Sequence, residues 1–221
     1  MVNFDLNKYN ASLKTDYIGR NLVYLKETGS TNSYASKLIN ERKKNRSNNP
    51  IKGTVILAEI QKKGKGRFKR KWISPAGGLW FTIILEPLLE PKDLIEVTLI
   101  AAYSIVKTLD RDYRINAVIK WPNDIYYGEL KLGGILAEVE RMKDITYLIT
   151  GIGLNVNLAK DDLAPYSRKS TSLKIILGKD IERETLLSKI LFSFEADYEY
   201  FSKTKDLKTL FKRIEKKLKL S

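Results

Sequence analysis

Four short stretches of this 221-residue chain combine cations, carboxylates or amides with glycine or proline, and such combinations build ligand sites. They are QKKGKGRFKRKW (61–72), KWPND (120–124), KLGG (131–134) and GIGLNVN (151–157). Ammonium and guanidinium groups, together with exposed backbone N–H groups, attract phosphate and carboxylate oxygens. The four stretches are therefore candidates for the binding of a small anion.

The 61–72 stretch reads as a loop between two buried strands. Gly64 and Gly66 permit close backbone approaches that other residues resist, and Lys65, Arg67 and Arg70 supply positive charge. The spacing is not that of a Walker A loop, and no helix is expected after it. A loop that wraps an anion and a solvated charge run both remain open from these residues alone.

The KWPND and KLGG stretches each have a chemical and a plain interpretation. Asn123 and Asp124 follow Pro122 at a strand end, where their oxygens could hold Mg²⁺ with a nucleotide phosphate, or could simply form a turn. Lys131 precedes a glycine pair and could direct its ammonium at an anion, or could be an exposed residue of a hairpin.

The GIGLNVN stretch contains half of a dinucleotide-binding fingerprint, but the third glycine and the following helix are missing. A Rossmann site is therefore rejected. Glycines in a strand would still let a flat ring lie on the backbone, with Asn155 as a hydrogen-bonding partner at its edge.

Composition excludes several kinds of chemistry. The chain has no cysteine and no histidine, so thiolate catalysis, Ser–His triads and zinc sites built on these residues are ruled out. Its formal net charge of +14 suits a polyanionic or acidic partner. No apolar run is long enough for a transmembrane helix, so no membrane association is expected, and a cysteine-free chain fits the cytoplasm.

The hydrophobic pattern predicts alternating strands and helices in one main unit. Strands are expected at 21–26, 53–60, 77–86, 116–124 and 145–157, with a hairpin at 125–140. Helices are expected from about 30, and at 93–111, 182–202 and 206–219. Strands outnumber helices, which predicts an α+β fold with helices packed on one side of a mixed, largely antiparallel sheet.

The order of these motifs resembles that of the biotin–protein ligases, also called biotin–[acetyl-CoA-carboxylase] ligases. Besides the four stretches, GSTN (29–32) and SPAGGLWFTIIL (74–85) carry the resemblance, which covers roughly residues 20–200. It implies a catalytic core like that of class II aminoacyl-tRNA synthetases. It also implies a reaction in which biotin and MgATP form biotinyl-5′-AMP and pyrophosphate, followed by transfer of biotin to a lysine of a biotin carboxyl carrier protein.

The resemblance also implies roles for particular residues. Lys131, Arg67 and Asp124 would be catalytic, with Asp124 as the candidate base toward the acceptor lysine. The implied biotin-binding residues are Ser30, Thr31, Gln61, Gly64, Lys65, Arg67, Trp72, Lys131 and Gly134. The implied ATP- and adenylate-binding residues are Lys65, Arg67, Arg70, Trp72, Asn123, Asp124, Lys131 and Asn155, with Asn123 and Asp124 nearest Mg²⁺.

The chain departs from the family's frequent pattern GRGRxGRxW at two positions. Lys65 stands for an arginine, and a lysine lacks the planar fork that binds two oxygens at once. Lys69 stands for a glycine, which loses backbone freedom. Loop closure over the adenylate is therefore expected to differ from that of relatives.

The resemblance gives further expectations about organisation. Residues 1–205 would be the catalytic domain and 206–221 a short basic helix, with the usual SH3-like C-terminal domain absent or truncated. About twenty residues before the core are too few for an N-terminal helix-turn-helix, so DNA binding is not expected. A homodimer is a weaker expectation.

Two other functions stay open at this point. A lipoate–protein ligase would share the fold, but the RRxxGGG-like stretch and histidine typical of that family are missing here. A nucleic-acid-binding module would use the basic loop, although no standard module motif is present.

Overall fold

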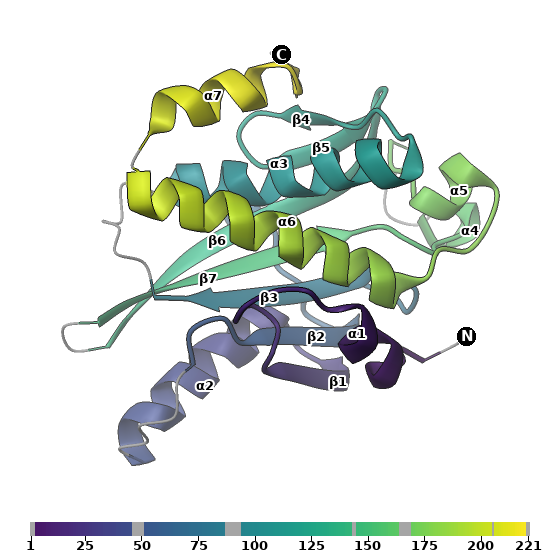
Figure 1. Ribbon diagram of the computed structural model, residues 1–221. Helices are drawn as coiled ribbons and strands as arrows, with labels where there is room; N and C mark the ends of the chain where they lie inside the picture. Colours follow the sequence, from purple (N-terminus) through teal and green to yellow (C-terminus); the bar gives the residue numbers. More distant parts are fainter. Residues whose placement is uncertain are drawn as a thin grey trace.

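One sheet of eight strands organises the part of the chain that the computed structural model describes, residues 3–45, 51–86, 94–142, 145–163, 169–204 and 206–219 (Figure 1). The strand order is β1-β2-β3-β7-β6-β5-β4-β8. The strands are β1 (Leu22–Thr28), β2 (Val55–Gln61), β3 (Leu79–Leu85), β4 (Val118–Lys120), β5 (Asp124–Tyr127), β6 (Leu130–Met142), β7 (Ile145–Leu154) and β8 (Leu218–Lys219).

The sheet is mixed and mainly antiparallel, as the sequence predicted. β1 pairs with β2 and β4 with β8 in parallel, while all the other neighbours run antiparallel. The longest pairing joins β6 to β7 and places Gly134 opposite Gly153. The α+β class is confirmed.

The helices that the structure describes are α1 (Leu6–Ser12), α2 (Thr31–Asn45), α3 (Leu94–Tyr113), α4 (Lys160–Leu163), α5 (Leu173–Leu177), α6 (Arg183–Thr204) and α7 (Leu207–Glu215). The predicted helix start at residue 93 lies outside the described residues. Among the described helices, none combines the length and the apolar character that a membrane crossing needs.

The two faces of the sheet are covered differently. Because side chains alternate along a strand, Val55 and Leu57 face the large core under α1, α3 and α6, whereas Ile56 faces a smaller core under α2. Figure 1 shows α6 running across the front of the sheet. The helices thus do not all pack on one side as expected: the short apolar stripe of α2, with Ala35 and Ile39, buries itself against the opposite face.

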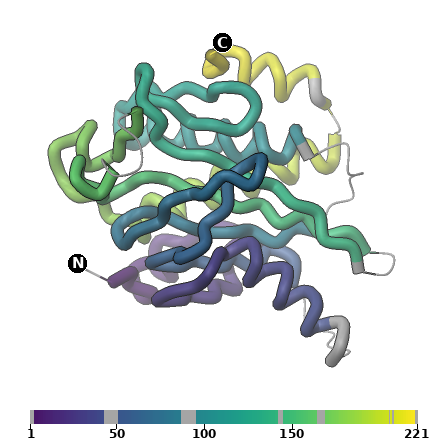
Figure 2. The backbone as a smooth tube through the Cα atoms, turned by 180° about the vertical axis from the view of Figure 1, so that it is seen from behind, coloured from purple at the N-terminus to yellow at the C-terminus, as the bar shows by residue number. Residues whose placement is uncertain are grey.

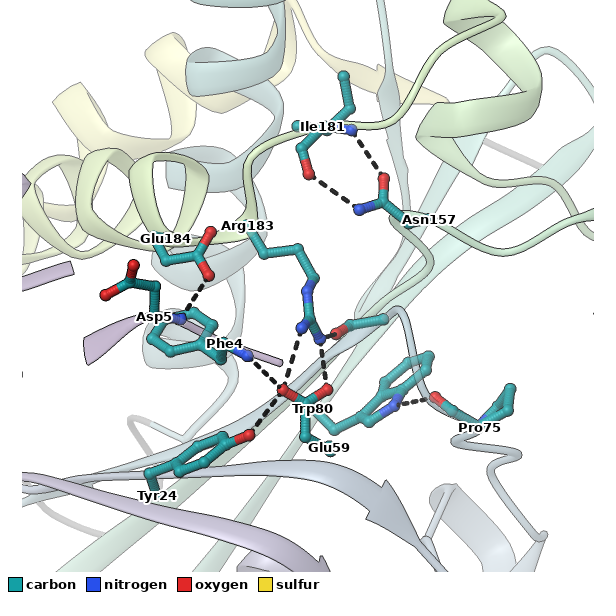
Figure 3. Close-up of polar contacts among 11 residues, drawn as sticks. Phe4, Asp5, Tyr24, Glu59, Pro75, Trp80, Asn157, Ile181, Arg183 and Glu184 are labelled. Carbon is teal, nitrogen blue, oxygen red and sulfur yellow. Dashed lines mark hydrogen bonds and ion pairs between the residues drawn. The ribbon is translucent and has the colours of Figure 1, made fainter. Parts of the chain in front are cut away.

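A buried polar cluster lies on the face under α6 (Figure 3). Glu59 of β2 accepts hydrogen bonds from Phe4 N (2.9 Å), from the Tyr24 hydroxyl (2.9 Å) and from both terminal nitrogens of Arg183 (2.7 and 3.0 Å). Arg183 also donates to Gly78 O at 3.1 Å. The cluster joins the N-terminal segment, β2, the turn before β3 and the start of α6, so it fixes the ends of these elements.

The C-terminal segment also packs on the main sheet. Leu210 and Ile214 of α7 are buried in the large core, and β8 pairs with β4 through Ile119 and Leu218. A single basic helix was expected over 206–219. It stops at Glu215, because a strand and an apolar stripe continue the fold. The division into 1–205 and 206–221 stays a prediction.

Candidate active site

A cavity of about 500 Å³ opens on the α2 side of the sheet, where the four stretches singled out in the sequence and the start of α2 converge. In Figure 2, the segment that follows β2 crosses in front of the sheet, on the side away from α6. Twelve of the thirteen residues assigned from the resemblance line this cavity: Ser30, Thr31, Gln61, Lys65, Arg67, Arg70, Trp72, Asn123, Asp124, Lys131, Gly134 and Asn155.

Gly64 is the thirteenth assigned residue, and it is not among the lining residues. It is buried, and its carbonyl accepts a hydrogen bond from Trp72 N at 2.9 Å. A Cβ at this position would overlap the Trp72 carbonyl. Gly64 therefore allows the two ends of the loop to come together, a role that its backbone performs.

The floor of the cavity is a patch of bare backbone on neighbouring strands. Register places Gly134 beside Gly153, and Gly151 beside Thr82 of β3. A Cβ at Gly153 would collide with the Trp72 indole, and one at Gly151 would collide with the Asn32 amide. The flat group that the glycines admit is thus first the Trp72 ring, which forms a wall of the cavity and contacts Trp80 edge-on at 6.4 Å.

The Trp72 indole also carries an unused donor. Its Nε1 is buried and has no hydrogen-bond partner among the described residues. A buried N–H without a partner costs free energy, so an acceptor supplied by a ligand would be favourable here.

One end of the cavity is a hydrogen-bonded polar corner at the start of α2. The Gln61 side-chain oxygen accepts from Thr31 N (2.8 Å) and Thr31 Oγ1 (3.1 Å), and its nitrogen donates to Ser74 Oγ (2.8 Å). Gln61 thereby satisfies one of the N–H groups that the first turn of a helix leaves free. The end of β2 and the start of α2 are held together by a side chain that also lines the cavity.

The glycine-rich loop folds back on itself as a small hairpin. Gly66 N donates to Arg70 O at 2.7 Å, and between them the chain makes a 3₁₀ turn over Arg67–Lys69. Phe68 and Lys69 have φ of 54° and 60°, a left-handed conformation that favours glycine. Lys69, which stands for a glycine of the family pattern, therefore lies at a position where the backbone conformation favours glycine.

Two of the cations that line the cavity contact neighbouring polar side chains of the cavity. Lys131 Nζ lies 2.7 Å from Asp124 Oδ2 and 5.2 Å from the Trp72 ring centre. Arg67 donates to Asn123 Oδ1 at 2.7 Å. Asp124 is the one carboxylate among the described lining residues, against six cations: Lys65, Arg67, Arg70, Lys71, Lys131 and Lys169. The cavity therefore favours an anionic ligand.

The donor set does not form a complete metal site on its own. The described residues include no group of three or more His, Cys, Asp or Glu side chains that could hold a metal. Asn123 and Asp124 each offer one oxygen to a cation of the protein. Mg²⁺ would fit here as part of MgATP, with phosphate oxygens and water completing its coordination.

Some lining residues were missed from the sequence. Asn32 directly follows Thr31 in GSTN, and its place in that motif is the one signal in the sequence that could have identified it. Lys169 and Ser170 reach the cavity because Lys131 N donates to Lys169 O at 2.8 Å and Lys131 forms a bridge with Ser170. The paired positions lie almost forty residues apart in the sequence, so no local sequence pattern predicts the pairing.

Asn155 lies at the other end of the glycine strand. It is 5% exposed, and its side-chain nitrogen donates to Thr171 O at 2.9 Å. Its backbone N–H donates to Leu132 O, beside Lys131. These bonds turn the amide to a fixed orientation at the cavity edge.

Comparison with known proteins finds a family model and relatives that match this chain. Residues 25–155 match the family model described as "Biotin/lipoate A/B protein ligase family". The "Bifunctional ligase/repressor BirA" of Bacillus spizizenii is 36% identical over 189 residues, covering 84% of this chain and 56% of that protein. "Biotin--protein ligase 2" of Arabidopsis thaliana is 30% identical, covering 95% of this chain and 63% of that protein. The chain thus spans less than two thirds of these relatives' length.

Solved structures share the fold. The Aquifex aeolicus biotin protein ligase in complex with biotin and ATP superposes with a TM-score of 0.72 at 33% identity, covering 90% of this chain and 78% of that one. The Leishmania major biotin protein ligase in complex with biotinyl-5-AMP gives a TM-score of 0.64 at 25% identity, covering 91% and 84%.

Proposed function

The chain belongs to the biotin/lipoate A/B protein ligase family, and we propose that it is an ATP-dependent, AMP-forming biotin–protein ligase. It joins biotin to AMP with release of pyrophosphate, then transfers biotin to a lysine of a biotin carboxyl carrier domain. The observation that carries the proposal is the cavity itself, where a polar corner, a bare glycine floor and six cations meet a single carboxylate.

Each part of the cavity suits one part of the adenylate. Ser30, Thr31 and Gln61 would hydrogen-bond the ureido ring of biotin at the polar corner, and Trp72 would line its apolar body. Asn155 would meet adenine at the opposite end. Lys65, Arg67, Arg70 and Lys131 would surround the phosphate between them, with Gly134 giving a backbone contact and Gly64 shaping the loop.

In the first step, a biotin carboxylate oxygen attacks the α-phosphorus of ATP, and the bond to pyrophosphate breaks. Both reactants are anions, so their repulsion must be reduced before they meet. Lys131 and Arg67 supply that charge once the ligands draw them away from Asp124 and Asn123. Asn123 and Asp124 would help to hold Mg²⁺ with the phosphates, and the ion would stabilise the negative charge of the pyrophosphate.

In the second step, the acceptor amine attacks the acyl carbon, AMP leaves, and one proton must be removed from the amine. Asp124 is the carboxylate at hand, and its separation from Lys131 would free an oxygen for this proton. Removing water from the closed cavity protects the mixed anhydride from hydrolysis.

The acceptor and the assembly belong to the same proposal. A chain with a formal net charge of +14 would associate rapidly with an acidic carrier domain.

We place the enzyme in the cytoplasm, where a cysteine-free protein is at no disadvantage. A homodimer could form through β1, which has no second strand neighbour among the described strands.

The test is direct. The protein is incubated with biotin and MgATP, freed of small molecules, and weighed by native mass spectrometry. A retained mass of biotinyl-5′-AMP supports the proposal, and its transfer to an isolated carrier domain completes it. Arg67→Ala should lose the retained adenylate while keeping the unfolding midpoint. If lipoate is adenylated instead of biotin, the substrate is wrong, and if neither is bound, the proposal fails.

A further inference from the structure

A continuous chain of polar contacts runs beneath the cavity from one end of the glycine-rich loop to the other. It starts at Ser74, just after the loop, which accepts from Gln61, and it passes to Thr31. Thr82 Oγ1 lies 2.7 Å from both Thr31 Oγ1 and Asn32 Oδ1 and donates to one of them at a time. The chain thus reaches Asn32, which is 4% exposed.

Glu138 of β6 carries this chain onward to the loop. Its Oε2 accepts a hydrogen bond from Asn32 Nδ2 at 2.7 Å. Its Oε1 faces Lys65 Nζ at 3.9 Å, with the two side chains 39% and 47% exposed. One carboxylate therefore contacts both the buried corner of the cavity and the first cation of the loop, although it does not line the cavity.

We propose that Glu138 is a positioning residue that couples closure of the 64–72 loop to the polar corner where the ureido ring of biotin would bind. This inference rests on the proposed function for its ligand. Glu138 Oε2 and, at 3.2 Å, Leu136 O both accept from Asn32 Nδ2, and together they hold the Asn32 amide in one orientation. Through its other oxygen Glu138 attracts Lys65 and favours the closed loop.

The geometry gives the two oxygens separable effects. The bond to Asn32 is short, charge-assisted and partly buried, so losing it loosens the corner itself. The contact with Lys65 is long and exposed, so it contributes modestly and can open and close as ligands enter and leave. A glutamine at 138 keeps an oxygen for Asn32 and loses the charge that attracts Lys65.

Glu140 offers a matched control. It lies two residues further along β6 on the same face, and its carboxylate accepts from Ser36 and Asn40 of the same helix α2. No loop cation contacts it in the described part of the chain. Glu140→Gln therefore removes a carboxylate against α2 without touching the loop.

The main experiment is a double-mutant cycle on the retention of the adenylate. Glu138→Gln should speed loss of biotinyl-5′-AMP from the enzyme by about threefold, and Lys65→Met by more, because Lys65 is also proposed to contact the phosphate. The double variant should be no faster than Lys65→Met, because the same contact is already gone. Glu138→Ala should in addition raise KM for biotin by about tenfold with little change in kcat, because Asn32 loses its charge-assisted bond and keeps only the longer one to Leu136 O. Glu140→Gln should match the wild type.

A second readout needs no ligand and separates this inference from the proposed function. Hydrogen exchange of the 64–72 amides in the free protein should be about threefold faster in Glu138→Gln, and unchanged in Glu140→Gln. If the wild type forms no adenylate, the proposed function fails, but amide exchange still tests Glu138. Equal exchange in Glu138→Gln and Glu140→Gln, or multiplying effects of Glu138→Gln and Lys65→Met, would overturn the positioning role.

Discussion

The two faces of the sheet treat charge in opposite ways. Under α6, Arg183 and Glu59 are 6% and 8% exposed, and four hydrogen bonds to the Glu59 carboxylate hold it in place. On the cavity face, Lys131 and Asp124 form a single contact with side chains 28% and 26% exposed. Buried charges are costly to separate, whereas half-exposed pairs exchange partners easily. The buried Arg183–Glu59 cluster suits a rigid connection between elements of the fold. The more exposed Lys131–Asp124 pair suits a site whose cation must turn toward a ligand.

The sharpest way to break the comparison is Arg183→Met. It leaves the Glu59 carboxylate buried without its cation, so the free energy of unfolding should fall by about 3–5 kcal/mol. Urea unfolding at neutral pH measures the loss. Lys189→Met, on the same helix, removes the surface pair with Asp112 and should cost less than about 1 kcal/mol. Similar losses in both variants would mean that the buried cluster is no stronger than a surface pair.

Lys131→Met tests the cavity face in the opposite sense. Adenylate formation should fall by about 100-fold, since a cation next to the developing phosphate charge is lost, while stability changes by less than about 1 kcal/mol. Pyrophosphate release and unfolding are measured on the same samples. Lys62→Met, which removes a surface pair with Glu27 beside the loop, serves as the control and should keep full activity.

Gly153→Ala tests the bare floor. The new methyl group would displace the Trp72 ring from the sheet, and KM for biotin should rise by about tenfold. Gly29→Ala, which places a methyl group in open space, is the control and should have little effect. An unchanged KM in Gly153→Ala would show that the position of Trp72 does not matter for biotin.

The pH dependence of stability sharpens the contrast. Burial alone would raise the pKa of Glu59, but the hydrogen bonds and charge of Arg183, aided by Phe4 N and Tyr24, lower it below 4.5. A lowered folded-state pKa stabilises the protein above the unfolded value, and this contribution is lost as pH falls through the folded value. The stability advantage of wild type over Glu59→Gln should therefore be constant from pH 6 to 8 and shrink below about pH 4.5. A constant difference down to pH 3 would contradict the lowered pKa.

Tyr24 remains a donor throughout that range. Burial and its hydrogen bond to Glu59 raise the pKa of Tyr24 to about 12, so the hydroxyl keeps its proton at any pH of the experiment. The pH dependence of the stability difference between wild type and Glu59→Gln is therefore that of the Glu59 carboxylate.

The smallest expected effect is at Lys69. Lys69→Gly removes the cost of a left-handed backbone and should raise the unfolding midpoint by about 1–2 °C, partly offset by the greater freedom of glycine in the unfolded chain. Lys71→Gly, in the same loop but without a positive φ, should lower the midpoint. A lower midpoint in both would mean that the left-handed turn carries no strain.

The sequence by itself determined the chemistry and the class of fold. Missing histidine and cysteine, the basic glycine-rich loop and the order of the motifs pointed to one small anionic ligand. Periods of two and of three to four residues distinguished strands such as 53–60 from helices such as 182–202. These features are local, because residue type and neighbouring positions decide them.

The tertiary structure decided which distant residues contact one another. The pairing of Lys131 with Asp124, the capping of α2 by Gln61, the arrival of Lys169 and the joining of Glu59 to Arg183 all link distant positions. Strand register sets such contacts, and a shift of one residue would turn each side chain to the other face. For the same reason the sequence could not show that α2 and the cavity lie on one face of the sheet. It also could not show that the buried Glu59–Arg183 cluster lies on the opposite face.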